Sequence, residues 1–123
     1  MSEVIILKAG DAERAADLHR QAFMDTEIWT ANAFQSLLAQ ETSLGLAHKR
    51  DGQLISLVLY RIALDTADML TFAVFPSKQR TGLAKALLNA SQPLLSARNV
   101  TRITLEVAQN NAAAVSFYER MGF

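Results

Sequence analysis

Apolar and polar positions alternate along the chain in a way that separates strands from helices. Residues 4–8 are apolar and β-branched, which predicts a first strand. Residues 12–23 carry apolar side chains at helical spacing, and Asp11 before them is suited to cap a helix. Residues 31–40 repeat the helical spacing after Thr30, which can cap a second, short helix. The first third of the chain therefore predicts one strand followed by two helices.

In the middle of the chain, short apolar runs separated by turn residues predict β-strands. Apolar runs at 44–49 and 54–61 flank an Asp-Gly pair at 51–52, which is the strongest short signal for a β-hairpin. Polar residues at 65–68 predict a second turn, and an apolar strand over 69–75 follows it. We therefore expect three consecutive antiparallel strands.

A long helical pattern follows this predicted sheet. It begins after Gly82 and ends at residues 98–99, with Pro93 inside it. Proline removes one backbone hydrogen bond and clashes one turn back, so we expect a kink or a local break near Asn89 rather than a stop. Residues 101–107 alternate and predict another strand. A strand, a helix and a strand in this order suggest a right-handed crossover to a parallel neighbour.

Two histidines and two large aromatic residues fall within the predicted elements. We interpret His19 as a helix-surface residue, because no second ligand lies at metal-binding spacing, and His48 as a strand-surface residue. Core packing is the favoured interpretation for Trp29 and Phe34, which flank and follow the start of the second helix. None of the four residues is assigned a chemical role by pattern alone.

Composition narrows the class of protein. The 123 residues are half hydrophobic, which fits one globular domain with a sizeable core. The formal net charge is zero, so broad attraction to nucleic acid or to an anionic membrane is not expected. No cysteine is present, which excludes disulfides, a thiolate nucleophile and cysteine-type zinc sites. The start lacks the features of a signal peptide and no apolar run approaches about 20 residues, so we expect a cytoplasmic protein.

A candidate anion-binding site lies where the predicted strand over 69–75 is followed by the long helix. Pro76 ends the strand because it cannot donate to a ladder, and Gly82 lets a ligand approach the backbone at the helix start. Free backbone N–H groups and the helix dipole favour an anion there, and Arg80 and Lys85 add positive charge. The pattern is neither a Walker loop nor a dinucleotide fingerprint, and an ordinary strand–turn–helix junction remains an alternative on spacing alone.

The six residues from 79 to 84, Gln-Arg-Thr-Gly-Leu-Ala, resemble the Gln/Arg-x-x-Gly-x-Gly/Ala motif of the GNAT family of N-acetyltransferases. The resemblance implies an α/β fold with a mixed, mostly antiparallel sheet flanked by helices, and acetyl-CoA as cosubstrate. It also implies an acceptor pocket beneath the segment that contains Trp29 and Phe34. The cofactor-binding residues that it implies are Phe72, Ala73 and Val74 along the pantetheine arm, and Gln79, Arg80, Thr81, Gly82, Leu83, Ala84 and Lys85 around the pyrophosphate.

The end of the chain strengthens the resemblance. Residues 105–107, 111–114 and 117–123 resemble the C-terminal block of the ribosomal-protein alanine N-acetyltransferases, a branch of the family. In that branch the residue matching Glu106 is a base for the acceptor ammonium, and the residue matching Tyr118 protonates the departing thiolate. The residue matching Asn111 contacts the cofactor. Taken alone, Glu106 would be read as a solvent-facing strand residue and Tyr118 as an amphipathic helix residue.

The sequence also departs from the family. Family members continue past the Gly-Phe pair at 122–123 with one or two further strands, which this sequence does not contain. We therefore expect residues 1–123 to form a single acetyltransferase domain, shortened at its C-terminus. An exposed sheet edge would then invite pairing with a second copy.

The function expected from the resemblance is direct acetyl transfer from acetyl-CoA to a primary amine. The N-terminal amine of a protein is the preferred acceptor, and no metal is expected. Two alternatives remain open: an N-acetyltransferase for a small amine or a lysine side chain, and a non-catalytic module that binds CoA.

Overall fold

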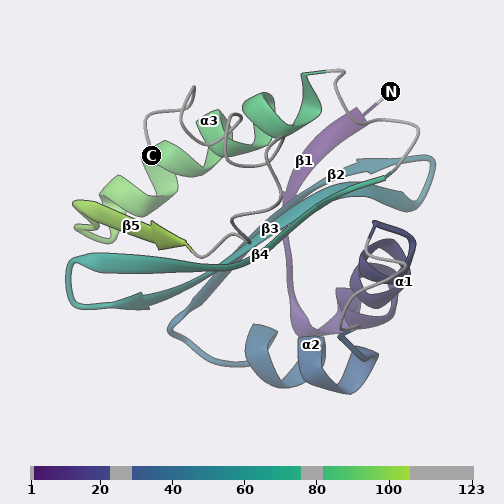
Figure 1. Ribbon diagram of the computed structural model, residues 1–123, viewed down its shortest axis with the longest axis horizontal. Helices are drawn as coiled ribbons and strands as arrows, with labels where there is room; N and C mark the ends of the chain where they lie inside the picture. The colour runs from purple at the N-terminus through teal and green to yellow at the C-terminus, as the bar shows by residue number, and fades with distance from the viewer. Residues whose placement is uncertain (1, 23–28, 76–81, 106–123) are drawn as a thin grey trace, which may run out of the picture.

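The computed structural model describes residues 2–22, 29–75 and 82–105 (Figure 1). The elements in chain order are β1 (Ser2–Ile6), the short 3-10 helix η1 (Ala9–Asp11), α1 (Ala12–Ala22), α2 (Ala31–Leu38), β2 (Ser43–Arg50), β3 (Gln53–Ala63), β4 (Thr66–Val74), α3 (Leu83–Ala97) and β5 (Arg102–Leu105). The strands form one sheet in the order β1-β2-β3-β4-β5. All neighbours are antiparallel except β4 and β5, which are parallel, so the expected mixed α/β fold is confirmed.

The sheet is covered on both faces. Helices α1 and α2 lie against one face, here called the α1/α2 face, and α3 crosses the other, here called the α3 face (Figure 1). Strand β3 is buried continuously from Leu54 to Tyr60, because its alternating side chains enter both cores. Leu57 and Leu59 enter the core beneath α1 and α2, whereas Val58 and Tyr60 enter the core beneath α3.

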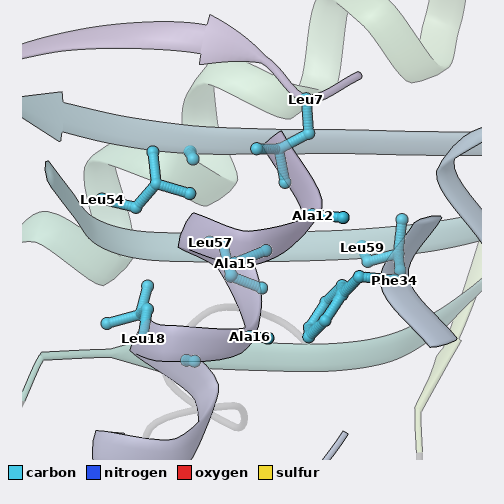
Figure 2. Close-up of a cluster of buried hydrophobic side chains, with 11 residues drawn as sticks. Leu7, Ala12, Ala15, Ala16, Leu18, Phe34, Leu54, Leu57 and Leu59 are labelled. Carbon is cyan, nitrogen blue, oxygen red and sulfur yellow. The ribbon is translucent and has the colours of Figure 1, made fainter. Parts of the chain in front are cut away.

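The core on the α1/α2 face combines small residues of α1 with leucines of the sheet. Ala12, Ala15 and Ala16 allow this helix to lie close to the leucines of β3, and Phe34 of α2 fills the space beside them (Figure 2). The side chain of Phe34 is fully buried, so its interpretation as a core residue is confirmed. Burying one such aromatic side chain stabilises a fold by about 1.5–3 kcal/mol.

The turns between β2, β3 and β4 test the hairpin predictions. Asp51 (φ 53°) and Gly52 (φ 78°) both have left-handed backbone, as a type I′ turn requires, so the first hairpin is confirmed. The second turn was expected at 65–68 but lies earlier, because β3 extends to Ala63 and β4 begins at Thr66. Only one face of β4 is buried at this end, so the polar residues expected to form a turn are instead the exposed positions of an alternating strand.

The first two helices are confirmed with one correction. The hydroxyl of Thr30 accepts a hydrogen bond from the N–H of Ala33 at 3.1 Å, as expected for the cap of α2. Asp11 is not the N-cap of α1. It is the last residue of η1, where its carboxylate accepts the backbone N–H of Lys8 at 2.9 Å and also bonds Arg14. Burial raises the pKa of Asp11, but these hydrogen bonds and the charges of Arg14 and Lys49 outweigh it and hold the pKa below its ordinary value.

Helix α3 continues through Pro93 without the local break that was considered near Asn89. Both residues are exposed, so water can bond the carbonyl group that loses its partner. Leu87, Leu88 and Leu95 on the opposite side of the helix are buried against the sheet and hold it in place. The helix leads to β5, which pairs in parallel with β4 as predicted. In the part of the chain that the structure describes, no helix is both long and apolar enough to span a membrane.

Candidate functional site

The start of α3 combines a glycine with a row of backbone N–H donors. Gly82, the residue before the helix, has φ 86° and ψ −1°, a left-handed conformation that glycine adopts readily. Its carbonyl accepts the N–H of Ala86 at 3.0 Å, so the helix ladder begins there. The amides of Leu83, Ala84 and Lys85 precede the first helical hydrogen bond and have no partner within the helix. Glycine has no side chain to cap them.

The surroundings of this helix start suit an anion. Among the described residues, nothing lies within 4 Å of the position where a Cβ atom on Gly82 would stand. The positive end of the helix dipole points toward this space, and the exposed Lys85 adds a full charge beside it. Gln79, Arg80 and Thr81, the other residues expected here, lie outside the described part of the chain.

The end of β4 is anchored on both faces of the sheet. Ala73 is buried in the core beneath α1 and α2, whereas Phe72 packs against the core beneath α3. The N–H of Phe75 donates to the carbonyl of Ile55 on β3 at 2.8 Å. Because backbone groups alternate along a strand, the amide of Ala73 also faces β3, and the amides of Phe72 and Val74 face the side of β5. The three residues expected along the cofactor therefore lie on a strand fixed by two cores.

Strand β5 lies parallel to the first half of β4, with Leu105 paired to Met69. The strand carrying the expected pantetheine residues and the strand that precedes Glu106 in sequence are thus neighbours. Glu106, Asn111 and Tyr118 themselves lie outside the described residues, so their expected roles remain predictions.

The structure places His19 in the core beneath α1 and α2, so the prediction of a helix-surface residue was wrong. Its side chain is 3% exposed, and its Nε2 lies 3.1 Å from the hydroxyl oxygen of Thr71 on β4. Its ring stacks on Trp29 with centroids 5.4 Å apart, and it meets Phe34 edge-on at 5.7 Å. Burial lowers the pKa of His19, which favours the neutral imidazole.

A signal for this burial was present in the sequence. His19 stands seven residues after Ala12 and four after Ala15, so it continues the stripe of α1 that faces the sheet. Because histidine is polar, it was assigned to the surface, although its spacing on α1 matches that of the buried residues. Trp29 is only half-buried, and it leaves part of its ring exposed beside the cluster.

His48 also lies in the interior, and its prediction as a strand-surface residue was wrong. Its side chain is 6% exposed, and its Nδ1 lies 3.0 Å from the hydroxyl oxygen of Ser56 on the neighbouring strand. Alternation along β2 places it on the α3 face with Leu46. Burial, together with the charge of Arg50, lowers the pKa of His48. Across residues 2–22, 29–75 and 82–105, no three acidic or histidine side chains gather as a metal site.

Comparison with known proteins agrees with this architecture. The sequence profile of the Acetyltransferase (GNAT) family matches residues 12–123. The ribosomal protein bS18-alanine N-acetyltransferase of Escherichia coli K12 is 35% identical over 95 residues, which cover 77% of this chain and 64% of that protein. The match thus spans less than two thirds of that relative. The protein of the same name from Salmonella typhimurium is 31% identical over 123 residues, covering 100% of this chain and 81% of its own length.

Solved structures give the same result. The crystal structure of the ribosomal-protein-S18-alanine N-acetyltransferase from Escherichia coli superposes with a TM-score of 0.88 at 30% identity, over 99% of this chain and 77% of that one. The PaiA N-acetyltransferase of Thermoplasma acidophilum, solved with coenzyme A, superposes with a TM-score of 0.89 over 100% of this chain and 89% of that one. Its 18% identity supports the shared fold alone. From the profile match and the Escherichia coli relative, the chain belongs to the GNAT family of acetyltransferases.

Proposed function

We propose that this protein transfers the acetyl group of acetyl-CoA to a primary amine, and that the amine is the N-terminal α-amine of a protein. The observation that carries the proposal is the start of α3, where a left-handed glycine precedes a row of backbone N–H donors that have no partner within the helix. Relatives with 31–35% identity are named for acetylating the alanine of a ribosomal protein, which supports this acceptor. We propose the cytoplasm as the site of action, since ribosomal proteins are made there.

The residues of the chain fit the cosubstrate. The amides of Leu83, Ala84 and Lys85 suit the pyrophosphate of CoA, with the Lys85 side chain as counter-charge, and Arg80 is proposed to act beside it. Residues Phe72–Val74 are proposed to run along the pantetheine arm, because they end a strand that both cores hold in place and that lies next to β5. Bound acetyl-CoA supplies the thioester, and the chain supplies its orientation.

Two further residues are proposed to move protons. The α-ammonium of a protein has a pKa of about 8 and must lose a proton before it can attack, and Glu106 is proposed to accept that proton. Tyr118 is proposed to donate one to the departing thiolate. A lysine side chain, with a pKa of about 10.4, is neutral far less often near pH 7.5, so a carboxylate base suits the α-amine better.

Two peptides test the proposal. The first begins with a free alanine amine and contains no lysine, and the second is blocked at its N-terminus and contains one lysine. Thiol release from acetyl-CoA is measured with each. Release with the first peptide only is the expected result. Release with the second only would replace this proposal by a lysine acetyltransferase, and release with neither would contradict a protein acceptor.

A further inference from the structure

His19 connects three elements that lie far apart in sequence. The ring belongs to α1, it bonds Thr71 of β4 across a separation of 52 residues, and it stacks on Trp29 just before α2. Trp29 in turn lies 5.3 Å from the ring of Phe34. Of these side chains, Trp29 and Thr71 are half-buried, while His19 and Phe34 are interior. The imidazole therefore fixes the relative positions of two side chains that reach the surface.

The position of this cluster relative to the proposed cofactor site is defined by the fold. Thr71 directly precedes Phe72, and its side chain is on the α1/α2 face, whereas helix α3, whose start is the proposed phosphate site, crosses the other face (Figure 1). Direct transfer without a covalent intermediate requires the amine to reach the thioester from a side that the cofactor does not occupy. On the α1/α2 face, Thr71 and Trp29 are the side chains of this cluster that remain partly exposed to an approaching amine.

Among the described residues, the elements around the cluster carry few charged side chains. Helix α2 carries no acidic or basic residue, and on α1 the nearest charged pair, Asp17 and Arg20, bond each other on the exposed side. On β4, Asp68 is exposed and bonds Thr104. A neutral imidazole in this setting adds no charge that would repel an incoming ammonium group.

We infer that His19 is a positioning residue for the acceptor. It holds Thr71 and Trp29 in place as the wall along which the acceptor amine approaches the thioester. The inference rests on the proposed function and extends it to residues of α1, β4 and the segment before α2. It concerns binding of the acceptor rather than binding of acetyl-CoA.

A pair of substitutions at Thr71 tests the inference without removing a large side chain. Thr71→Val keeps the shape and removes the hydroxyl, whereas Thr71→Ser keeps the hydroxyl. Kinetics are measured with the alanine peptide at saturating acetyl-CoA. Thr71→Val should raise the acceptor KM about three- to tenfold, the range expected for one lost hydrogen bond, and change the acetyl-CoA KM less than about twofold. Thr71→Ser should restore the acceptor KM.

His48 supplies a matched control. Like His19 it is nearly fully buried and bonds a hydroxyl group, at 3.0 Å instead of 3.1 Å, but it lies on the α3 face. His19→Gln should raise the acceptor KM at least as much as Thr71→Val, whereas His48→Gln should lower the melting temperature and leave the acceptor KM unchanged. If His19→Gln does not fold, the two variants at Thr71 still decide the question.

The outcomes separate this inference from the proposed function. An unchanged acceptor KM in Thr71→Val, or equal rises in His19→Gln and His48→Gln, would overturn the positioning role while the wild-type activity stands. Absence of wild-type turnover with either peptide would overturn the proposed function and this inference together.

Discussion

The two faces of the sheet each bury a histidine that bonds a hydroxyl group, but they obtain the bond in different ways. On the α3 face, His48 meets Ser56 eight residues later, directly across the β2–β3 hairpin. On the α1/α2 face, His19 meets Thr71 only when α1 is docked against β4. The first contact is a property of one hairpin, whereas the second reports the packing of a helix on the sheet. The hydrogen bond of His48 therefore forms within one hairpin, whereas the hydrogen bond of His19 requires the tertiary fold.

The largest expected effect comes from removing the aromatic side chain that supports His19. Phe34→Ala should lower the free energy of unfolding by about 3–5 kcal/mol, because it removes a fully buried ring and leaves a cavity. Leu87→Ala, at a fully buried position on the α3 face, should lower it by about 2–5 kcal/mol. Chemical denaturation measures both.

The chain contains one tryptophan, so its fluorescence distinguishes the two variants. Trp29 lies against Phe34 and His19, and the native emission should therefore change in Phe34→Ala and not in Leu87→Ala. Equal changes in both variants would mean that the two cores are not independent.

An intermediate effect is expected at the start of α3. Gly82→Glu places a negative charge at the proposed anion site and a side chain on left-handed backbone, so acetyl-CoA affinity should fall at least about tenfold. Gly52→Glu is a matched control, because Gly52 has φ 78° and open space around it but lies in the β2–β3 turn. Both variants should lose stability through backbone strain. Isothermal titration should show loss of acetyl-CoA binding in the first variant alone, and equal affinity in the two would refute the phosphate assignment.

The smallest effect concerns pH. The pKa of His19 is lowered by burial in the folded protein, so between that value and about 6.5 the unfolded chain binds more protons. Stability should therefore rise with pH up to about 6.5 and level off above it, and His19→Gln should make the rise shallower.

His48 has a lowered pKa as well, so His48→Gln should also make the rise in stability shallower. Of the two histidines, His19 is the one that stacks on Trp29, so its protonation is the one expected to change the tryptophan emission. Emission of Trp29 should titrate in acid in the wild type and in His48→Gln, and it should not titrate in His19→Gln. A titration that persists in His19→Gln would show that another group near Trp29 is responsible.

The sequence predicted best where structure is decided locally. The Asp-Gly pair at 51–52 requires only its own backbone conformation, and Thr30 caps α2 through its own side chain, so both were found in advance. The motif around Gly82 is also contiguous in sequence, but its role in binding phosphate stays a prediction. The left-handed backbone of Gly82, which glycine adopts readily, was not predicted from the sequence.

Features that depend on distant partners were missed. No residue near His19 in sequence indicates that it contacts Thr71, 52 residues away. The burial of His48 depends on the helix that crosses its face of the sheet. The start of β4 was misplaced because Thr66 and Asp68 resemble turn residues, although they are the exposed half of an alternating strand. Glu106, Asn111 and Tyr118 rest on resemblance to the family, and the structure does not test them.

The order of strands in the sheet follows the order of strands in the chain. Consequently β2, β3 and β4 form two successive hairpins that need only short loops to close, and this meander can assemble early and quickly. Strand β1 reaches its partner only across α1 and α2, so its pairing carries a larger loop-closure entropy and comes later. In kinetic terms, the contacts of His19 with β4 belong to this late docking step. Weakening them should speed the unfolding of the domain far more than it slows folding.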